Sequence, residues 1–599
     1  MNIGSRVARV IDLSAASTQQ VICGFRISLE RYRTEDQKPS PVIERVIAAS
    51  GTRRLRVCIE PASMQLAPIS RTQRLEGDYL LGDGQDAGQA KQEFLGHGAL
   101  LRIEERQVFL RTSLTGFPPI FVYQDGLQTV IASSIARIAA IPGVRLAFDA
   151  QGIAELARIG KPINYRTLFK NLSIVPAGTG LQLNLTEGLR VVETWRPSEE
   201  APFASWKDYI AAQEEALAAA LHRMDLSRSF FSLTAGLDTR AIFALLYRGG
   251  VALPAFTKSS SSGCLDAKRA KELCDAYKIV HETILLDQNF TAQFPECVIE
   301  ASFLSGGLAS FNEASEIFFY KILSSTYDAR LSGNLGNQIG RSGTEGASMR
   351  DVPTNILAPE FLNIAENLPK HHWFETVTNG EKFNTLQLIQ QESLFASIAN
   401  FSIGQSYVTQ QTPYADRTVI LQKLREPIIS ANSTNSTNST AVRMRDLKHR
   451  FLGDPRHTSF QRQLIIHTGG EVARNPINWG WRASGGVSLS GILYGMLALL
   501  DVVISTRLPK NSLAARTVSR LGMSGFSSFE YEDLLSRRPI AEFVYDTLKS
   551  DAATSNAVLN QAMLRRALDV GFNDRAARKK LLFALDVVLA QRNFKINDG

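Results

Sequence analysis

The chain has 599 residues, of which 44% are hydrophobic and 21% charged, so its composition is that of an ordinary globular protein and its length predicts two or more domains. A formal net charge of +8 permits contact with anionic partners, but it is too small for this length to predict nucleic-acid binding. The five cysteines are scattered without paired spacing, which argues against a zinc site or a disulfide scaffold, and with no apolar signal core after Met1 we expect a cytoplasmic protein.

Residues 1 to about 150 are predicted to be mostly β. Short alternating apolar runs, such as 20–27 and 99–103, are broken by Gly, Asp and Pro, and this alternation is typical of half-buried strands. A helix is predicted at 149–159. The polar, Pro-containing stretch 198–206 reads as a linker. We therefore predict two domains, 1–200 and 201–599.

The most informative stretch is a turn of mainly small residues, Thr234-Ala235-Gly236-Leu237-Asp238, between a predicted strand at 229–233 and a predicted helix at 239–247. Such a turn at a helix N-terminus directs backbone N–H groups at an anion. The hydroxyls of Thr234 and Thr239 can bind phosphate oxygens. A carboxylate beside an anion needs a cation between them, so Asp238 is a candidate Mg²⁺ ligand. A purely structural strand–turn–helix unit is the alternative.

The region around this turn alternates helices and strands. Helices are predicted at 206–223, 266–278 and 312–326, and strands at 253–257, 279–286 and 329–331. This alternation predicts a doubly wound parallel sheet. A second loop, Ser332-Gly-Asn-Leu-Gly-Asn-Gln338, follows the last of these strands and is expected in the same crevice as the first. His281 either contacts a ligand there or is a structural residue at a strand end.

The remainder of the chain is predicted to be mainly helical. Its apolar run 487–500 is 14 residues long, and a membrane span needs about 20, so we predict a buried helix and no membrane span. Three Asn-Ser-Thr repeats at 432–440 read as a surface loop. Basic clusters at 443–456 and 565–580 read as solvated faces, although the first could receive an acidic peptide.

Both loops resemble motifs of the asparagine synthetase superfamily. The first resembles the pyrophosphate loop Ser-Gly-Gly-Leu-Asp-Ser of ATP-pyrophosphatase enzymes, with Ala235 in place of the first Gly. The second resembles the family's Ser-Gly-Glu-Gly-x-Asp-Glu, with Asn334 in place of the Glu and Asn337 in place of the second Mg²⁺-binding Asp. An Asn can ligate a cation through its carbonyl oxygen but contributes no charge.

The N-terminal region resembles the glutaminase domain of asparagine synthetases. The matching segments are 115–123, 130–137, 175–178 and the run Trp195-Arg-Pro197. The family's nucleophile is a Cys exposed by removal of Met1, whereas this chain has Asn2. Because the nearest cysteine is Cys23, well inside the chain, we expect a glutaminase-type fold without glutamine hydrolysis.

The resemblance implies an α/β protein with two parts. The N-terminal part would be an Ntn-hydrolase-like, glutaminase-type αββα domain, and the C-terminal part a doubly wound ATP-pyrophosphatase domain (adenine nucleotide α hydrolase-like) with helical additions. Such enzymes use ATP and Mg²⁺ to transfer AMP to a carboxylate and release pyrophosphate, and an amine then attacks the acyl-adenylate.

One branch of the superfamily fits best. The Asp-Thr-Arg ending of the first loop, the Pro-x-Asn-x-Gly-Trp run at 476–481 and the length are most like the lasso-peptide macrolactam synthetases. These close a ring between an Asp or Glu side chain and the N-terminal amine of a precursor peptide. We therefore expect a precursor peptide as substrate, and a leader peptidase and a leader-recognition protein as partners.

The resemblance also implies roles for individual residues. Catalytic roles fall on Asp238, Asn334 and Arg240, and Mg²⁺ binding on Asp238 and Asn337. Nucleotide contacts are expected at Leu233, Thr234, Ala235, Gly236, Leu237, Thr239, Phe256, Ser332, Gly333 and Gly336.

Three other functions remain open. A plain asparagine synthetase or a β-lactam synthetase-like ligase would use the same crevice. Loss of catalysis would leave a peptide-binding scaffold, and the family's Lys near the phosphates is indeed absent from 474–481. Arg474 or Arg482 could supply that positive charge instead.

Overall fold

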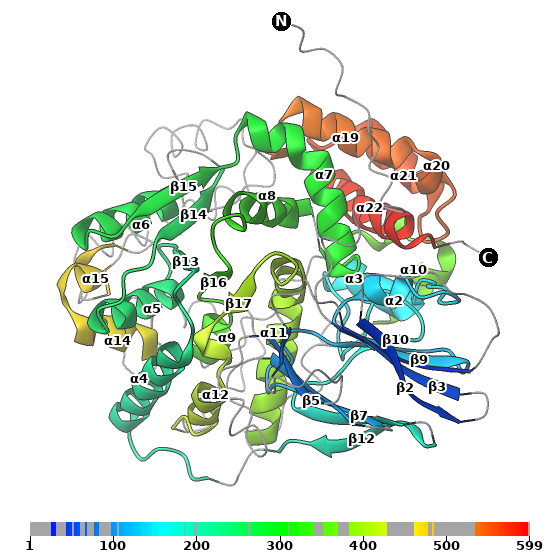
Figure 1. The fold of residues 1–599 in the computed structure, drawn as a ribbon. Helices are drawn as coiled ribbons and strands as arrows, with labels where there is room; N and C mark the ends of the chain where they lie inside the picture. The colour runs from blue at the N-terminus through cyan, green and yellow to red at the C-terminus, as the bar shows by residue number, and fades with distance from the viewer. Residues whose placement is uncertain are drawn as a thin grey trace, which may run out of the picture.

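The computed structural model describes strands between residues 25 and 82 and most of the chain beyond residue 97 (Figure 1). Several sequence predictions lie outside the described residues, namely those for Asn2, Cys23, 432–440, 443–456 and 487–500. The described ranges are 25–31, 43–50, 53–59, 66–68, 77–82, 98–104, 107–184, 186–196, 200–260, 264–309, 311–340, 352–368, 382–427, 460–476, 482–483 and 534–596.

Two six-stranded antiparallel sheets form the N-terminal region, as the alternating apolar pattern predicts. In β7 the residues alternate between half-buried and buried, because successive side chains of a strand point to opposite faces. One sheet has the order β10 (Leu172–Ile174), β8 (Phe121–Gln124), β9 (Gln128–Ala132), β1 (Phe25–Arg31), β3 (Arg53–Ile59) and β2 (Ile43–Ser50). The other has the order β12 (Gly188–Thr194), β11 (Thr179–Asn184), β7 (Gln107–Thr112), β6 (Gly98–Ile103), β5 (Gly77–Gly82) and β4 (Leu66–Pro68).

Two short helices accompany these sheets. α2 spans Ile135–Ala139 and α3 spans Ala150–Arg158. The side chain of Asp149 caps α3 by accepting a hydrogen bond from the backbone N–H of Gly152. This confirms the helix predicted at 149–159 to within one residue at each end.

A five-stranded parallel sheet forms the centre of the C-terminal region, and it confirms the predicted doubly wound arrangement. Its order is β15 (His281–Leu285), β14 (Ala255–Ser259), β13 (Ser229–Ser232), β16 (Ala329–Leu331) and β17 (Thr409–Gln411). The chain moves outward from β13 to β15 and then returns to the other side of β13. Consecutive Phe230 and Phe231 of β13 are both buried because both faces of the sheet are covered.

Helices cover the two faces of this sheet (Figure 1). On one side lie α4 (Trp206–Arg223), α5 (Leu237–Arg248) and α14 (Phe460–Thr468), and on the other lie α7 (Gln288–Ser305) and α8 (Ala314–Leu323). The remaining helices of the central region are α6 (Leu265–Ala276), α9 (Gly336–Gly340), α10 (Pro359–Asn367), α11 (Lys382–Gly404), α12 (Arg417–Leu424) and α15 (Gly470–Arg474). Within the described ranges, no helix combines the length and the apolar character that crossing a membrane requires.

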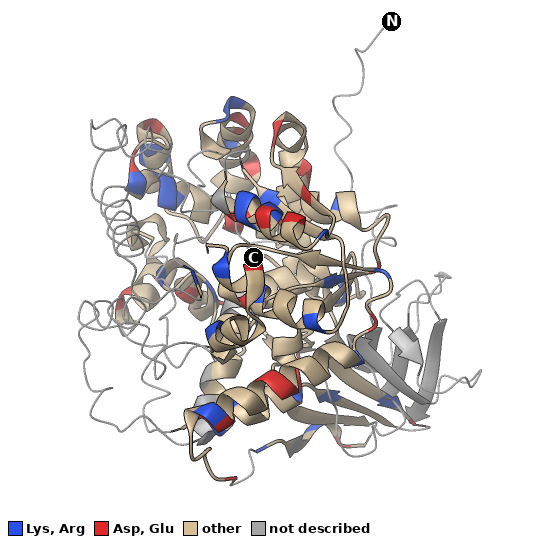
Figure 2. Ribbon diagram, turned by 90° about the vertical axis from the view of Figure 1, so that its left-hand side faces the viewer, with Lys and Arg blue, Asp and Glu red and all other residues tan. Residues whose placement is uncertain are grey.

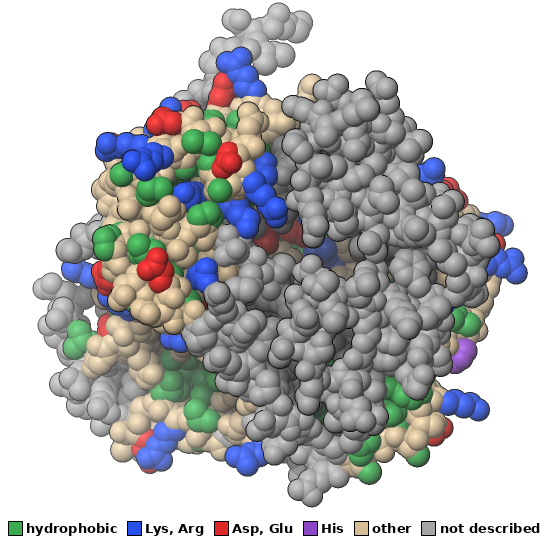
Figure 3. All heavy atoms as spheres, turned by 180° about the vertical axis from the view of Figure 1, so that it is seen from behind, with side chains coloured by type: hydrophobic (Ala, Val, Ile, Leu, Met, Phe, Trp, Pro, Cys, Tyr) green, Lys and Arg blue, Asp and Glu red, His purple; other side chains and the backbone are tan. Residues whose placement is uncertain are grey.

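The C-terminal helices are α19 (Arg538–Lys549), α20 (Asp551–Thr554), α21 (Gln561–Val570) and α22 (Arg575–Phe594). Of these, α19 and α22 pack against α7 in the upper part of Figure 1, and α20 and α21 pack against α22. Arg565, Arg566 and Arg575 of the predicted basic cluster are exposed. Figure 3 shows basic, acidic and apolar side chains mixed over this part of the surface. Figure 2, which faces the left-hand side of Figure 1, shows basic and acidic residues interspersed along the helices there. The arrangement agrees with a solvated face.

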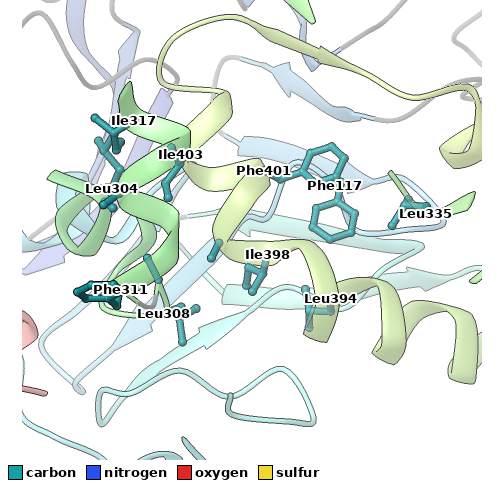
Figure 4. Packing of buried hydrophobic residues seen from close by; sticks show 14 of the residues in the cluster. Phe117, Leu304, Leu308, Phe311, Ile317, Leu335, Leu394, Ile398, Phe401 and Ile403 are labelled. Carbon is teal, nitrogen blue, oxygen red and sulfur yellow. The ribbon is translucent and has the colours of Figure 1, made fainter. Parts of the chain in front are cut away.

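One hydrophobic cluster joins the antiparallel and parallel regions (Figure 4). Phe117, which precedes β8, stacks on Phe401 of α11 with ring centroids 4.3 Å apart. Gly306, the αL cap of α7, lies so close to α2 that an added Cβ would be 2.3 Å from Cδ1 of Ile135. The two regions therefore share a core, and the division into domains at residue 200 remains a prediction.

Candidate functional site

The two loops singled out in the sequence follow neighbouring strands. The first loop, 233–238, follows β13, and the second loop, 332–337, follows β16. These strands pair in parallel, with Phe231 opposite Leu331, so both loops leave the same edge of the sheet. The strand order reverses between β13 and β16, and ligands of doubly wound proteins bind at such a switch point.

The two loops are packed directly against each other. A Cβ added to Gly333 would lie 2.8 Å from Cγ2 of Thr239 and 3.0 Å from its backbone nitrogen. A Cβ added to Gly336 would lie 2.6 Å from both Cβ and Cγ of Asp238. Neither glycine has a positive φ. These positions therefore require glycine for space, and the predicted site residues of the two loops do come together.

Hydroxyl groups brace the first loop internally. Oγ1 of Thr239 donates to the carbonyl of Thr234 at 3.1 Å and accepts from its backbone N–H at 3.2 Å. The two hydroxyl oxygens are 3.1 Å apart, and the N–H of Gly236 donates to Oγ1 of Thr234 at 3.3 Å. The Thr239 proton is thus used within the loop. The 3.1 Å contact then has the Thr234 hydroxyl as its donor, so the two hydroxyls predicted to bind phosphate are engaged with each other in this structure.

Ala235 is accommodated where the resembled motif has glycine. Its backbone does not adopt a positive φ, so a Cβ causes no strain. The residue is fully buried, and its N–H donates to Oδ1 of Asp266, in the first turn of α6, at 3.3 Å. The Asp266 carboxylate holds this part of the turn, and the conformational freedom of a glycine is not needed at position 235.

Asp238 lies in the first turn of α5, whose N-cap Gly236 provides no side-chain cap. A carboxylate in this position interacts favourably with the helix dipole. Its Oδ1 accepts a hydrogen bond from Nε2 of Gln461 at 3.0 Å, and its backbone carbonyl accepts one from the hydroxyl of Tyr414 at 2.9 Å. Both donors are fully buried. Two distant segments therefore hold the side chain and the backbone of Asp238.

The environment of Tyr414 reflects this contact. Burial raises its pKa well above the ordinary value, the charge of Asp238 raises it further, and a hydrogen bond with Gln461 opposes the shift. The hydroxyl is therefore protonated at neutral pH and remains a donor to Asp238. Tyr414 belongs to the segment 412–417, which was not assigned a site role from the sequence.

The second loop differs in character. Its Leu335 is buried and has φ +67°, a left-handed conformation that favours glycine, and the resembled motif has glycine at this position. The carbonyl of Asn334 accepts a hydrogen bond from the hydroxyl of Thr412 at 2.6 Å. Asn337 is exposed. The residue of this loop that packs against Asp238 is Gly336, and its neighbour Asn337 makes no such contact in the described interactions.

The donor set fits a lightly held magnesium ion. Among the described residues, no three His, Cys, Asp or Glu side chains are grouped as metal ligands. A cation here would have the Asp238 carboxylate as its protein ligand, and phosphates and water would complete its coordination. Magnesium is commonly held by one or two carboxylates together with substrate phosphates and water. Asp238 at the helix N-terminus satisfies that minimum.

Arg240 lies behind the first loop and is fully buried. Its guanidinium donates to the carbonyls of Asn475 and Pro476, the latter at 3.0 Å, and to that of Ala235 at 3.5 Å. Burial and the nearby positive charge of Arg269 lower its pKa to about 10, so it stays charged at pH 7. These contacts link α5 to the segment after α15, and the catalytic role of Arg240 remains a prediction.

Arg474 and Arg482, which could replace the missing Lys, take no part in the contacts that Arg240 makes with Asn475 and Pro476. The side chain of Arg474 is 71% exposed and lies 3.9 Å from Glu471. Arg482 is also exposed. The structure therefore gives neither residue a contact with the two loops, and residues 477–481 lie outside the described chain.

Leu233 and Phe256 form part of the sheet edge beside the loops. The N–H of Leu233 donates to the carbonyl of Phe256 at 3.0 Å, and its carbonyl accepts from Oγ1 of Thr257 at 2.6 Å. That hydroxyl also lies 2.8 Å from Nε2 of His281. Burial lowers the pKa of His281 to about 4, so it is neutral at pH 7. Its contacts match the structural alternative.

A mostly buried ion network lies beside the first loop and was not predicted from the sequence. Glu316 of α8 pairs with Lys258 of β14 at 2.6 Å and with Arg330 of β16 at 2.9 Å. Arg330 also donates to Oγ of Ser232, the last residue of β13, at 3.0 Å. Burial opposes ionisation of Glu316, but the charges of Lys258 and Arg330 lower its pKa to about 2.

Comparisons with known proteins give little further information. No protein-family model matches the chain, and no curated protein matches it. A solved structure titled "Structure of the allosteric regulatory enzyme of purine biosynthesis" matches with 11% sequence identity, covering 45% of this chain and 75% of that chain, at a TM-score of 0.18. A similarity of this size carries no argument about the fold.

Proposed function

We propose that this chain is an ATP-dependent, AMP-forming carbon–nitrogen ligase related to asparagine synthetases, and that it closes a macrolactam ring in a leaderless precursor peptide. The observation that carries the proposal is the contact between the two loops at the switch point, with Asp238 at a helix N-terminus against Gly336. The backbone N–H groups at the helix N-terminus, the Asp238 carboxylate and the uncharged second loop suit a nucleoside triphosphate bound together with a divalent cation.

The proposed reaction has two steps. An oxygen of an Asp or Glu side chain of the peptide attacks the α-phosphorus of ATP, and pyrophosphate leaves. The peptide's α-amine then attacks the acyl carbon, loses one proton and expels AMP, so that one amide bond forms. Mg²⁺ held by Asp238 and the phosphates would neutralise charge on the departing pyrophosphate.

Residues of this chain would contribute mainly position and charge. The N-terminus of α5 directs its first N–H groups at the phosphates. The Thr234 hydroxyl, which here contacts the hydroxyl of Thr239, would have to turn toward a phosphate to add a donor. Holding carboxylate and amine within one peptide makes the second step effectively unimolecular, which provides a large entropic advantage.

The N-terminal sheets would be a glutaminase-type, Ntn-hydrolase-like domain retained for packing. In the proposed reaction the amine belongs to the peptide substrate, whereas a plain asparagine synthetase would take ammonia from glutamine. The precursor peptide, a leader peptidase and a leader-recognition protein would be the partners of this chain.

The test supplies purified protein with ATP, Mg²⁺ and the leaderless peptide, together with the partner proteins. Expected products are AMP, pyrophosphate and a peptide lighter by one water whose N-terminus no longer reacts with amine reagents. Formation of ADP would exclude the adenylation reaction. Linear peptide with accumulating AMP would exclude ring closure, and glutamate release from glutamine would favour an asparagine synthetase. Absence of ATP binding would favour a peptide-binding scaffold.

A further inference from the structure

Gln461 is a buried polar residue at the centre of the two-loop contact. It lies on α14 and has no exposed surface. Its Nε2 donates to Oδ1 of Asp238 at 3.0 Å and to the carbonyl of Gly336 at 2.8 Å. One amide nitrogen thus holds the carboxylate of the first loop and the backbone of the second.

The surroundings are shaped around this amide. A Cβ added to Gly340 of α9 would lie 1.8 Å from Nε2 of Gln461, so α9 approaches the amide as closely as it does because residue 340 is glycine. The two acceptors also fix the amide orientation, since only the nitrogen can donate to both. Oε1 is buried without a hydrogen-bond partner, which costs free energy.

We infer that Gln461 is a positioning residue, which rests on the proposed function: it sets the orientation of the Asp238 carboxylate relative to the second loop for binding of a magnesium–nucleotide complex. The amide is neutral, so it orients the carboxylate without neutralising its charge. A Lys or Arg there would compete with the cation for Asp238. A hydrophobic residue would leave Asp238 and the Gly336 carbonyl without this donor.

The inference makes a prediction about magnesium dependence. Gln461→Met is close in volume and removes both hydrogen bonds. Binding of ATP is measured by titration calorimetry over a series of MgCl₂ concentrations and in the presence of a chelator. The Mg²⁺ concentration for half-maximal ATP binding should rise about tenfold, the effect of losing one hydrogen bond to a charged group. The weak binding without Mg²⁺ should not change.

Gln463→Met is the matched control, because Gln463 lies on the same helix and is half-buried. It should bind ATP with wild-type magnesium dependence. Should the Met variant of Gln461 fail to fold, Gln461→Asn is measured instead, since its amide is one methylene too short to reach Asp238.

Two results would overturn the inference. An unchanged Mg²⁺ requirement in the folded Gln461 variant would show that the amide does not position the carboxylate. Equal weakening with and without Mg²⁺ would show a purely structural role. Either result leaves the proposed function intact if wild-type protein still forms AMP and pyrophosphate. If ATP binding by wild-type protein does not depend on Mg²⁺, both the role of Gln461 and the proposed function are overturned.

Discussion

The two loops at the switch point are neighbours, yet they are built on different principles. In the first, hydroxyls and a carboxylate brace the backbone through Thr234, Thr239 and Asp266, and Asp238 provides charge. In the second, Gly333 and Gly336 provide space and Leu335 is buried in the hydrophobic core. The first loop is therefore suited to bind charge, and the second to fix the shape against which that charge is held.

This comparison predicts that substitutions in the two loops fail in different ways. A change of charge in the first loop should affect cation and nucleotide binding with little effect on stability. A change of volume in the second should move Asp238 and affect both.

The largest effect is expected from Asp238→Asn. It removes the carboxylate that lies against Gly336 of the second loop, while Asn can still accept the hydrogen bond from Gln461. We expect Mg²⁺-dependent AMP formation to fall by a factor on the order of 1,000, as when a preorganised electrostatic contact is lost. Pyrophosphate release measures this, and the melting temperature should change little. Activity within about threefold of wild type would mean that the first loop does not supply the charge.

Gly336→Ala tests the shape of the second loop. The added Cβ would lie 2.6 Å from Cβ of Asp238, so one of the loops must shift. Overpacking of this kind costs about 1–3 kcal/mol, and we expect both lower stability and weaker nucleotide binding. Thermal unfolding and calorimetry provide the two readouts. Gly249→Ala is the control, because its added Cβ would lie 3.4 Å from the carbonyl oxygen of Leu245, an ordinary van der Waals distance.

The ion network of Glu316, Lys258 and Arg330 is expected to contribute to the free energy of unfolding and not to the reaction. The folded pKa of Glu316 is about 2, below the ordinary value of about 4.3. Its stabilisation is therefore present above pH 4.3 and is lost as the pH falls toward 2. Glu316→Gln should destabilise the fold by about 3 kcal/mol at pH 7 and flatten the acid limb of the stability curve. Urea unfolding between pH 2 and 7 measures this, and an unchanged acid limb would contradict the assignment.

The smallest effect is expected from Asn337→Ala. Asn337 is exposed and Gly336 occupies the place against Asp238. We expect the Mg²⁺ concentration for half-maximal ATP binding to change by less than about threefold, as for a surface substitution. A tenfold increase would instead assign Asn337 a direct part in holding the cation, as the resemblance to asparagine synthetases implies.

Much of the parallel sheet could be predicted because its elements have strong local patterns. The strand at 329–331 and the helix at 206–223 match β16 and α4 at both ends. β17 was not predicted, because Thr409–Gln411 is polar. Its glutamines are buried through side-chain hydrogen bonds, Gln410 with Tyr320 and Gln411 with Ser229. α7 was missed because Pro295 inside it reads as a helix breaker.

The site was predictable only where its residues are close in sequence. The turn 234–238 is visible as a strand–turn–helix pattern. Tyr414 and Gln461 contact Asp238 from 176 and 223 residues away, and no local spacing connects them. One signal was present for Gln461: it occupies the helix face of Leu464 and Ile465 at i+3 and i+4. A polar residue on a buried helix face requires a polar partner.

The shared hydrophobic core limits which parts of this protein can be lost during evolution. Phe117 stacks on Phe401, and Gly306 is fitted against Ile135, so each region completes the interior of the other. A truncated gene lacking the antiparallel sheets would leave α7 and α11 with an uncovered apolar face. Such a product would be prone to aggregation. Selection on the chemistry of the parallel sheet would therefore preserve the N-terminal region even if that region performs no chemistry of its own.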